Sequence, residues 1–379
     1  MSGGMELYLH MPFCVRKCAY CDFLSFPSGA ETQRMYAKRL MKDIDVMGKR
    51  YGEIPVETIF IGGGTPSVPD SALIVEIMEH VRHAFHVADG AEISMEANPG
   101  TVTREKLTDY RKAGINRLSF GLQSANDREL KLLGRIHTWA EFLESFTLAR
   151  ECGFANLNID LMSALPGQTC ESWKETLSRV TELDPEHISA YSLIIEEGTP
   201  FGERYGSEEG RKLLPDEDSE REMYHETKRF LKDCGYERYE ISNYAKPGRE
   251  CRHNIGYWTG VPYLGLGLGA SSYLDGCRFT VNPDMKQYLE EKPGMFADIE
   301  KLTKKDMEEE FFYVGLRMTA GVSLSEFERR FGISAKEVYP GLMETFVKEK
   351  AARFEGDRFV LTDYGLDVSN YIMAQFLQD

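Results

Sequence analysis

The apolar run Leu7-Tyr8-Leu9-His10-Met11-Pro12-Phe13 directly precedes Cys14-Val15-Arg16-Lys17-Cys18-Ala19-Tyr20-Cys21. Three thiols therefore lie within eight residues, separated by three and by two intervening residues. A loop this short turns back on itself, so all three sulfur atoms can point toward one soft metal centre. No fourth ligand stands beside them, whereas structural zinc needs four ligands and cuboidal iron–sulfur clusters usually have four thiolates. A cluster held by three thiolates would leave one iron open to a substrate or cofactor.

Three kinds of site fit the cysteine loop: structural zinc, a redox dithiol, and an iron–sulfur cluster with an open iron. Zinc needs a fourth ligand, which His10 could supply, although Met11-Pro12-Phe13 separates it from Cys14 and makes convergence awkward. A redox pair of Cys18 and Cys21 leaves the third thiol unexplained. The spacing favours the cluster.

Size and composition restrict the class of protein. With 379 residues, 42% of them hydrophobic, the chain can bury a large core and a smaller appendage, and we expect two domains. A formal charge of −16 repels phosphate backbones, so nucleic acid is not an expected partner. The sequence contains no run of eighteen apolar residues, and Met1–Glu6 has neither a basic n-region nor an apolar h-region. We therefore expect no integral membrane segment and a cytoplasmic location. Eight sparse cysteines indicate a reducing compartment, and the five outside the loop are expected to be small buried residues.

Short apolar runs of β type alternate with longer amphipathic stretches between Glu6 and Ser192, which is typical of repeated βα units and a parallel sheet. The expected strands are Glu6–His10, Thr58–Ile61, Glu92–Glu96, Arg117–Leu122, Asn156–Leu161 and His187–Ser192. The expected helices are Ala30–Gly48, Asp70–Phe85, Arg104–Ala113, Trp139–Glu151 and Glu171–Leu183. This alternation favours an open or closed α/β barrel with its chemistry at the C-terminal ends of the strands, and a doubly wound open sheet is the alternative.

The second half of the chain has a different character. Glu196–Pro215 is expected to be a loop, and Glu217–Gly235 a helix. Tyr263–Ala270 has glycine at every second position, which predicts a strand face without side chains that another group approaches closely. The last segments are expected at Met307–Met318, Leu324–Phe331, Ala335–Lys350, Arg353–Leu361 and Asp363–Leu377. Their order resembles a winged-helix module, and the acidic composition favours a packing or partner-docking role over DNA binding.

Polar residues and glycines follow several of the expected strands. Gly62-Gly63-Gly64-Thr65-Pro66 would offer bare backbone groups to a phosphate, carboxylate or amine, or would form a plain tight turn. Glu96 and Asp160 end apolar strands, where a buried carboxylate is costly without a partner, and Arg135 and Gln123 are the partners we expect. These groups either contact a ligand or form a buried ring of ion pairs at the barrel rim.

Several sequence blocks resemble the radical S-adenosylmethionine (SAM) superfamily and, within it, the coproporphyrinogen III dehydrogenase-like group. The blocks are the cysteine triplet with Tyr8–Phe13 before it, Gly62–Ser67, Gly121–Ser124, Gly134–His137, Asn158–Met162 and Leu165–Thr169. The resemblance covers nearly the whole chain. It implies a partial (β/α)6 radical SAM barrel, similar to a TIM barrel, at residues 1–235. A linker or β region with a haem motif follows at 236–300, and a smaller, mainly helical winged-helix-like domain at 301–379.

The resemblance also implies the cofactors. A 4Fe-4S cluster would be bound by Cys14, Cys18 and Cys21, with S-adenosylmethionine on its open iron and an electron donor for any radical chemistry. Position by position, the S-adenosylmethionine site would be lined by Tyr8, Tyr20, Gly63, Gly64, Thr65, Glu96, Gln123, Arg135 and Asp160. Backbone groups at Gly63–Thr65 suit the amine, Arg135 suits the carboxylate, and Asp160 can accept hydrogen bonds from ribose hydroxyls.

Phe23 separates two branches of the group. The decarboxylating dehydrogenases have a cysteine at this position, two residues after the triplet, and a longer N-terminal extension; this chain resembles the haem-chaperone branch instead. The segment His253-Asn254-x2-Tyr257-Trp258 resembles that branch's haem-associated motif, which implies that His253 binds haem iron beside the other three residues. Cys251 is an alternative axial ligand, and a satisfied loop histidine beside core aromatics is the structural alternative.

The expected function is therefore that of a haem chaperone, which holds haem on a scaffold with a cluster and S-adenosylmethionine and hands it to acceptor haemoproteins. One alternative is an oxygen-independent coproporphyrinogen III oxidase, a radical SAM enzyme that decarboxylates propionates oxidatively. Another is a non-catalytic haem carrier whose cluster only controls assembly. A homodimer built through the cluster or haem is also considered.

Overall fold

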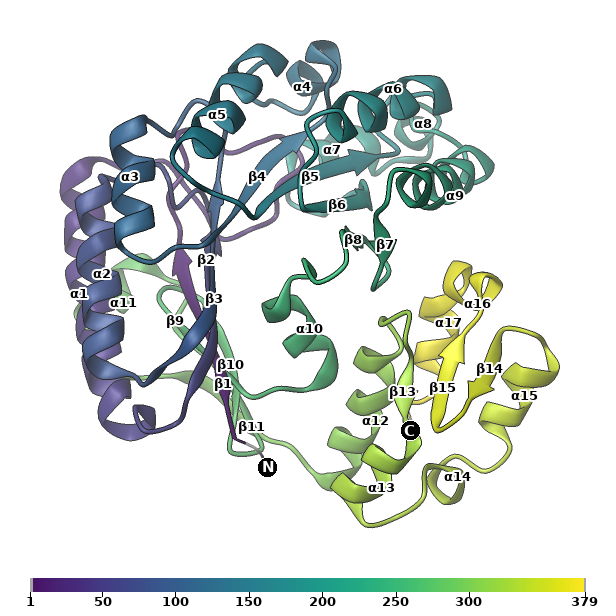
Figure 1. The fold of residues 1–379 in the computed structure, drawn as a ribbon. Coiled ribbons are helices and arrows are strands. Elements are labelled where there is room, and N and C mark those ends of the chain that lie inside the picture. The colour runs from purple at the N-terminus through teal and green to yellow at the C-terminus, as the bar shows by residue number, and fades with distance from the viewer. Residues whose placement is uncertain (1–2, 378–379) are drawn as a thin grey trace.

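A computed structural model describes residues 3–377, and its largest feature is a curved twelve-stranded sheet (Figure 1). Six neighbouring strands are parallel: β1 (Met5–Met11), β2 (Val56–Gly63), β3 (Val87–Ala97), β4 (Arg117–Gln123), β5 (Leu157–Ser163) and β6 (His187–Ser192). The sheet does not close, because β1 pairs with β9 and β6 pairs with β8. The expected partial barrel of six βα units is confirmed.

Helices cover the outer face of the parallel strands (Figure 1). They are α1 (Ala30–Tyr51), α2 (Ser71–Ala84), α3 (Arg104–Lys112), α4 (Asp127–Leu132), α5 (Trp139–Glu151) and α6 (Cys170–Thr181). The helix α5 begins and ends where the sequence predicts, and capping explains its start: Thr138 and Glu141 form a reciprocal capping box there. The short α4 is an addition that the apolar periodicity did not predict.

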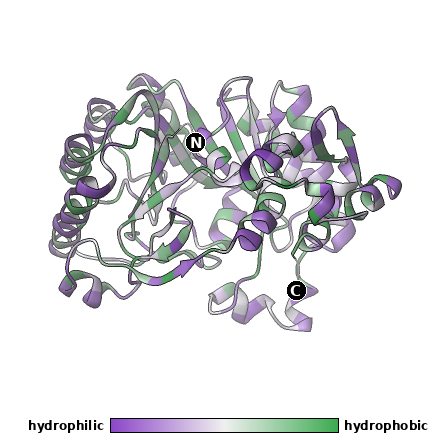
Figure 2. Ribbon diagram, turned by 90° about the horizontal axis from the view of Figure 1, so that it is seen from below, coloured by the Kyte–Doolittle hydropathy of each residue, from purple (hydrophilic) through white to green (hydrophobic). Residues whose placement is uncertain are grey.

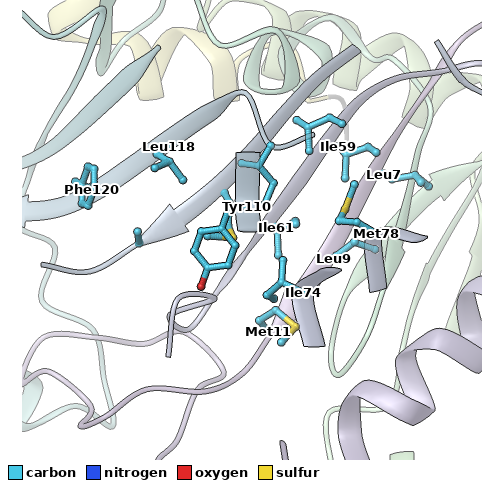
Figure 3. Packing of buried hydrophobic residues seen from close by; sticks show 14 of the residues in the cluster. Leu7, Leu9, Met11, Ile59, Ile61, Ile74, Met78, Tyr110, Leu118 and Phe120 are labelled. Atoms are coloured by element: carbon cyan, nitrogen blue, oxygen red, sulfur yellow. The ribbon is translucent and has the colours of Figure 1, made fainter. Parts of the chain in front are cut away.

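Alternate residues of each parallel strand face opposite sides of the sheet. Leu7 and Leu9 of β1 point outward and are fully buried with Ile74 and Met78 of α2 (Figure 3). Each such aliphatic side chain contributes about 1.5–3 kcal/mol by leaving water. The intervening residues of the strand point into the barrel, and these are largely polar. Hydrophilic residues are frequent along the outer helices, and hydrophobic stretches run through the strands that they cover (Figure 2).

Residues 236–300 extend the sheet at both of its edges. β9 (Tyr263–Leu266), β10 (Ser271–Leu274), β11 (Cys277–Thr280) and β12 (Ala297–Lys301) follow β1, and β8 (Asn243–Ala245) and β7 (Glu237–Arg238) follow β6. Between them, α10 (Arg252–Thr259) lies in the opening of the barrel (Figure 1). The helix α11 (Met285–Glu290) contacts α1.

The expected glycine-lined strand is only partly correct. β9 ends at Leu266, because Gly267 and Gly269 have φ of +96° and +66° and form a turn. The expected close approach is nevertheless present: a Cβ on Gly267 would lie 2.4 Å from the hydroxyl of Tyr36. Two short helices, α7 (Pro200–Tyr205) and α8 (Glu208–Arg211), occupy the segment expected to be a loop, and α9 (Glu217–Asp233) follows as expected.

The C-terminal part has its own hydrophobic cluster and its own sheet, in the order β13-β15-β14. Its elements are α12 (Lys304–Gly315), β13 (Val322–Ser323), α13 (Leu324–Phe331), α14 (Ala335–Val338), α15 (Leu342–Lys348), β14 (Ala352–Glu355), β15 (Arg358–Leu361), α16 (Asp363–Asp367) and α17 (Ser369–Ala374). The single helix expected at Ala335–Lys350 is wrong, since Pro340 and Gly341 interrupt it and Gly341 has φ of +74°. The last helix is likewise divided, at Val368.

Two further expectations concern membrane-spanning segments and the burial of the cysteines. Within residues 3–377, no helix combines the length and the apolarity needed to cross a membrane. All eight cysteines are free, but only Cys251 of the five outside the loop is buried; Cys234 is exposed and the other three are half-buried. The expectation that all five would be buried is therefore wrong.

Candidate functional site

The cysteine loop begins directly after β1, at the C-terminal ends of the parallel strands. The loop is closed by two backbone hydrogen bonds: the N–H of Cys14 donates to the Phe26 carbonyl at 3.1 Å, and the N–H of Phe26 donates to the Pro12 carbonyl at 2.9 Å. Cys14, Cys18 and Cys21 are all half-buried. The loop therefore presents its thiols at the barrel edge where the sequence predicts chemistry.

The three thiols influence one another but are held by different neighbours. The Sγ of Cys14 lies 3.6 Å from the Thr65 hydroxyl, and the Sγ of Cys18 accepts from Arg135 at 3.6 Å. Among residues 3–377, no three or more His, Cys, Asp and Glu side chains are already grouped as a metal site. Burial raises the pKa of Cys21, and its two neighbouring cysteines raise it further. A cationic metal centre stabilises the thiolate form of a cysteine, so three thiols in one loop are suitable donors for an iron–sulfur cluster.

His10 is already fully hydrogen-bonded inside the barrel. Its Nδ1 lies 3.0 Å from the Tyr8 hydroxyl and its Nε2 lies 2.9 Å from the Leu24 carbonyl. Burial lowers its pKa, so the ring is kept neutral. His10 also fills the space beside Gly63, where an added Cβ would lie 2.3 Å from the ring. Because both of its ring nitrogens are hydrogen-bonded, His10 is poorly placed to be the fourth ligand of a zinc ion.

The glycine run at the end of β2 packs against the base of the cysteine loop. The N–H groups of Gly64 and Thr65 donate to the carbonyls of Met11 and Phe13 at 2.8 and 2.7 Å. The N–H of Gly63 donates to Glu96 at 3.0 Å. The expectation of bare N–H groups in this loop is therefore wrong, and its backbone instead fixes the two loops against each other.

Glu96 and Asp160 point into the barrel without the partners we expected. Burial raises the pKa of Glu96 to about 8, and nearby Asp160 adds to the shift. Burial also raises the pKa of Asp160, although its carboxylate accepts from Ser119 at 3.0 Å and from Asn158 at 2.7 Å. This pair of carboxyl groups is suited to accept hydrogen bonds from amine or hydroxyl groups of a ligand.

Arg135 and Gln123, the two expected partners, are engaged elsewhere. Arg135 donates to Asn98, to the Gly121 carbonyl and to the thiol of Cys18. The amide of Gln123 accepts from Tyr191 at 2.9 Å, and its backbone has φ of +75°, a strained conformation for a residue other than glycine. The alternative in which these groups form a ring of buried ion pairs at the barrel rim therefore does not hold, since Arg135 donates to Asn98, Gly121 and Cys18.

A cleft lies beside the cysteine loop, and Arg135, one of its lining residues, has an unsatisfied donor. It is lined by Val15, Arg16, Cys18, Thr65, Val68, Asn98, Thr101, Gly134, Arg135, Ile136 and His137. The Nε of Arg135 is buried and has no hydrogen-bond partner in the described part of the chain. A buried guanidinium with a free donor is a place for an anionic group such as a carboxylate.

The two expected site tyrosines do not line this cleft and come from different segments. Tyr8 points into the barrel from β1 and stacks on Phe60, with ring centroids 6.4 Å apart. Tyr20 lies in the cysteine loop and packs against Phe201 of α7, and burial raises its pKa. The helix α7 is further tied to the loop because the N–H of Phe201 donates to the Ala19 carbonyl at 2.9 Å.

Asn98 is the site residue that the sequence reasoning missed. Its side chain donates to Thr65 and accepts from Arg135, each at 2.6 Å. Asn98 follows β3 by one position and stands two residues after Glu96. The period-two alternation that placed Glu96 in the site could therefore have indicated Asn98 as well.

The segment expected to bind haem lies at the opposite end of the barrel strands. His253 is in α10, not in a loop, and it is 1% exposed. Its Nδ1 lies 2.7 Å from the Thr58 hydroxyl and its Nε2 lies 3.0 Å from the Tyr257 hydroxyl. Burial lowers its pKa to about 3. Asn254, Tyr257 and Trp258 are half-buried.

The alternative axial ligand is also buried. Cys251 has no exposed surface, and its thiol donates to Glu92 at 3.4 Å. Burial raises the pKa of Cys251 to about 12, so the thiol is protonated. Neither His253 nor Cys251 reaches the surface in this conformation, and their role in haem ligation stays a prediction.

Comparisons with known proteins extend over the whole chain. A family model of the radical SAM superfamily matches residues 8–180, and a model of the HemN C-terminal domain matches residues 302–368. The heme chaperone HemW of Bacillus subtilis is 35% identical over 374 residues, which cover 98% of each chain. The heme chaperone HemW of Escherichia coli is 35% identical over 99% of this chain and 98% of its own. Among solved structures, coproporphyrinogen III oxidase (HemN) from Escherichia coli, a radical SAM enzyme, matches with a TM-score of 0.85 and 25% identity over 99% of this chain and 90% of that chain.

Proposed function

Because the chain belongs to the HemW family of heme chaperones within the radical SAM superfamily, we propose that it binds haem and transfers it to acceptor haemoproteins. The observation that carries this proposal is the extent of the similarity, which spans 98% of this chain and 98% of the Bacillus subtilis chaperone. Similarity limited to a single domain would support the proposal much less, because one fold can serve many functions. The free thiols of the cysteine loop are compatible with the reducing cytoplasm.

The family implies a 4Fe-4S cluster and S-adenosylmethionine, and the described side chains suit both groups. Cys14, Cys18 and Cys21 would hold the cluster. Arg135 would bind the methionine carboxylate through its unsatisfied Nε, and Glu96 and Asp160 would accept hydrogen bonds from amine and ribose hydroxyl groups. When bound and reduced, this pair of cofactors supplies reductive cleavage of a sulfonium C–S bond. The residues themselves orient the ligand and keep water from its reactive end.

Haem is proposed to bind at the segment that includes His253, Asn254, Tyr257 and Trp258. In the structure, the ring nitrogens of His253 are satisfied by Thr58 and Tyr257. Ligation of iron by His253 would therefore require one ring nitrogen to exchange its hydrogen bond for an iron–nitrogen bond, while the other nitrogen could keep its partner. Haem binding would then change the environment of Trp258, over which the Arg317 guanidinium stacks at 4.4 Å.

Coproporphyrinogen oxidation is the second candidate, favoured by the close structural match to HemN. The chaperone function has the greater support, because the two HemW chaperones are 35% identical to this chain, whereas HemN is 25% identical to it. Phe23 also favours the chaperone, because the decarboxylating enzymes of the group that this chain resembles have a cysteine at this position.

One experiment separates the two candidates. The protein is reconstituted with iron and sulfide without oxygen, and one portion is titrated with haem while absorbance is recorded. A second portion receives coproporphyrinogen III, S-adenosylmethionine and a reductant. The proposal expects a saturable haem spectrum in the first portion and no protoporphyrinogen in the second. Protoporphyrinogen formation would refute the chaperone assignment, and an unchanged haem spectrum would remove its basis.

A further inference from the structure

The side chain of Asn98 joins two contacts that the barrel makes with the cysteine loop. Its Nδ2 donates to the Thr65 hydroxyl and its Oδ1 accepts from Arg135 Nη2, each at 2.6 Å. The Thr65 hydroxyl lies 3.6 Å from the Sγ of Cys14, and Arg135 Nη1 lies 3.6 Å from the Sγ of Cys18. One amide thus connects two of the three thiols through a continuous series of hydrogen bonds.

The donors and acceptors in this series can be assigned from chemistry. A guanidinium has only donors, so Oδ1 of Asn98 must face Arg135 and its NH₂ group must face Thr65. The Thr65 oxygen accepts that hydrogen bond, which leaves its own hydroxyl hydrogen free to point toward Cys14. Both ends of the series therefore present a hydrogen to a sulfur atom. Hydrogen bonds to ligand sulfurs are one of the factors that set the reduction potential of an iron–sulfur cluster.

Asn98 itself is held in place by its backbone. Its N–H donates to the Ser67 hydroxyl at 3.3 Å, and its carbonyl accepts from the Thr101 hydroxyl at 2.7 Å. Lys106, whose pKa is lowered by burial, donates to the Ser67 carbonyl at 2.7 Å and so ties the same two loops together. The amide of Asn98 is therefore preorganised before any cofactor binds.

We propose that Asn98 is a positioning residue for the cluster. It fixes the Thr65 hydroxyl as the donor to Cys14 and the Arg135 guanidinium as the donor to Cys18, and no contact of its own with a thiol is needed. This inference rests on the proposed assignment of the cluster to the cysteine loop. Asn98 would tune the potential of the cluster and slow its loss.

The test uses the full-length protein with two substitutions of Asn98. In Asn98→Asp the carboxylate still accepts from Arg135, but it cannot donate to Thr65 and draws the hydroxyl hydrogen away from Cys14. In Asn98→Ala both connections are lost. After reconstitution, iron content, the rate of iron loss to a chelator, and the midpoint potential are measured, the last by a redox titration followed by electron paramagnetic resonance. We expect a more negative midpoint potential in both variants and faster iron loss in Asn98→Ala.

Asn116 supplies the matched control. Its amide also makes two hydrogen bonds, to the N–H of Ile93 and the carbonyl of Ala91, but these lie at the other end of the barrel strands. Asn116→Ala should lower the thermal midpoint and leave the cluster potential and iron loss as in the wild type. The Thr65→Val substitution removes the Cys14 connection, so the potential shift caused by Asn98→Ala should be smaller in a Thr65→Val background.

The outcomes separate this inference from the proposal on which it rests. A wild-type protein that takes up no iron would overturn the cluster assignment and this inference together. Loaded Asn98 variants with the potential and iron-loss rate of the wild type would overturn this inference alone, even if their thermal midpoints fall as in Asn116→Ala. Loss of all iron from the Asn98 variants but not from Asn116→Ala would support it.

Discussion

Glu6 is a buried acid whose titration should be measurable in the stability of the whole protein. It points into the barrel from β1, is 2% exposed, and lies 3.9 Å from Nδ1 of His253. Its Oε2 has no hydrogen-bond partner among residues 3–377. Burial raises the pKa of Glu6 from 4.5 to about 9, the Thr58 hydroxyl partly offsets the shift, and the charge of Glu92 adds to it.

The sign and size of the effect follow from these pKa values. The unfolded chain releases the proton near pH 4.5, whereas the folded protein keeps it up to about pH 9. The contribution of Glu6 to stability is therefore fully present below pH 4.5 and is lost as pH rises toward 9. The limiting slope is about 1.4 kcal/mol per pH unit, so the loss between about pH 5 and about pH 7.5 is at most about 3 kcal/mol.

The substitution Glu6→Gln keeps the shape of the side chain and removes its titration. Urea unfolding followed by circular dichroism is measured across this pH range for the wild type and the variant. We expect the variant to gain stability relative to the wild type as pH rises. An infrared difference spectrum at neutral pH should also lose the band of a protonated carboxyl group.

Glu57→Gln is the control for this experiment. Glu57 lies on the neighbouring strand β2 with its side chain 48% exposed, paired with Arg252. An exposed ion pair contributes about 0–1 kcal/mol, so this variant should follow the wild-type curve closely. If Glu6→Gln also runs parallel to the wild type at every pH, Glu6 titrates normally and the reasoning from its burial is refuted.

Three further substitutions test other parts of the structure. Tyr36→Phe should cost about 2–3 kcal/mol of unfolding free energy, because the hydroxyl joins two buried backbone groups at 2.6 and 3.0 Å; a thermal midpoint equal to the wild type would contradict this. Cys18→Ser should abolish the brown absorbance of the reconstituted protein, while Cys234→Ser at an exposed position should not, and full iron content in Cys18→Ser would refute the ligand assignment. His253→Ala should alter the haem stoichiometry or spectrum; an identical haem titration together with a lowered thermal midpoint would leave His253 a purely structural role beside Thr58.

The local features of the fold could be predicted well from the sequence. The strand His187–Ser192 and the helix Trp139–Glu151 have the predicted boundaries, since apolar periodicity and a capping box are encoded by neighbouring residues. The helix expected at Ala335–Lys350 is wrong because its apolar pattern continues across Pro340-Gly341, where the backbone leaves the helical conformation. Local rules therefore suffice where they agree with one another.

The partners of the site residues could not be predicted in the same way. His253 contacts Thr58, which lies 195 positions away along the chain, and Arg135 contacts Asn98, 37 positions away. Such pairs depend on how strands are arranged around the barrel and on which polar group happens to be nearest inside it. Arg135, Glu96 and Asp160 do lie at the same end of the barrel, as expected. Arg135, however, donates to Asn98 and Gly121 and not to the two carboxylates.

Transfer of haem tests the central claim most directly. The reconstituted protein is loaded with haem, separated from excess, and mixed with an apo-haemoprotein such as apomyoglobin, and the spectra of both proteins are followed with time. The proposed function predicts that the acceptor gains haem while the protein loses an equal amount. Haem that never leaves the protein, or a protein that takes up none, would contradict it.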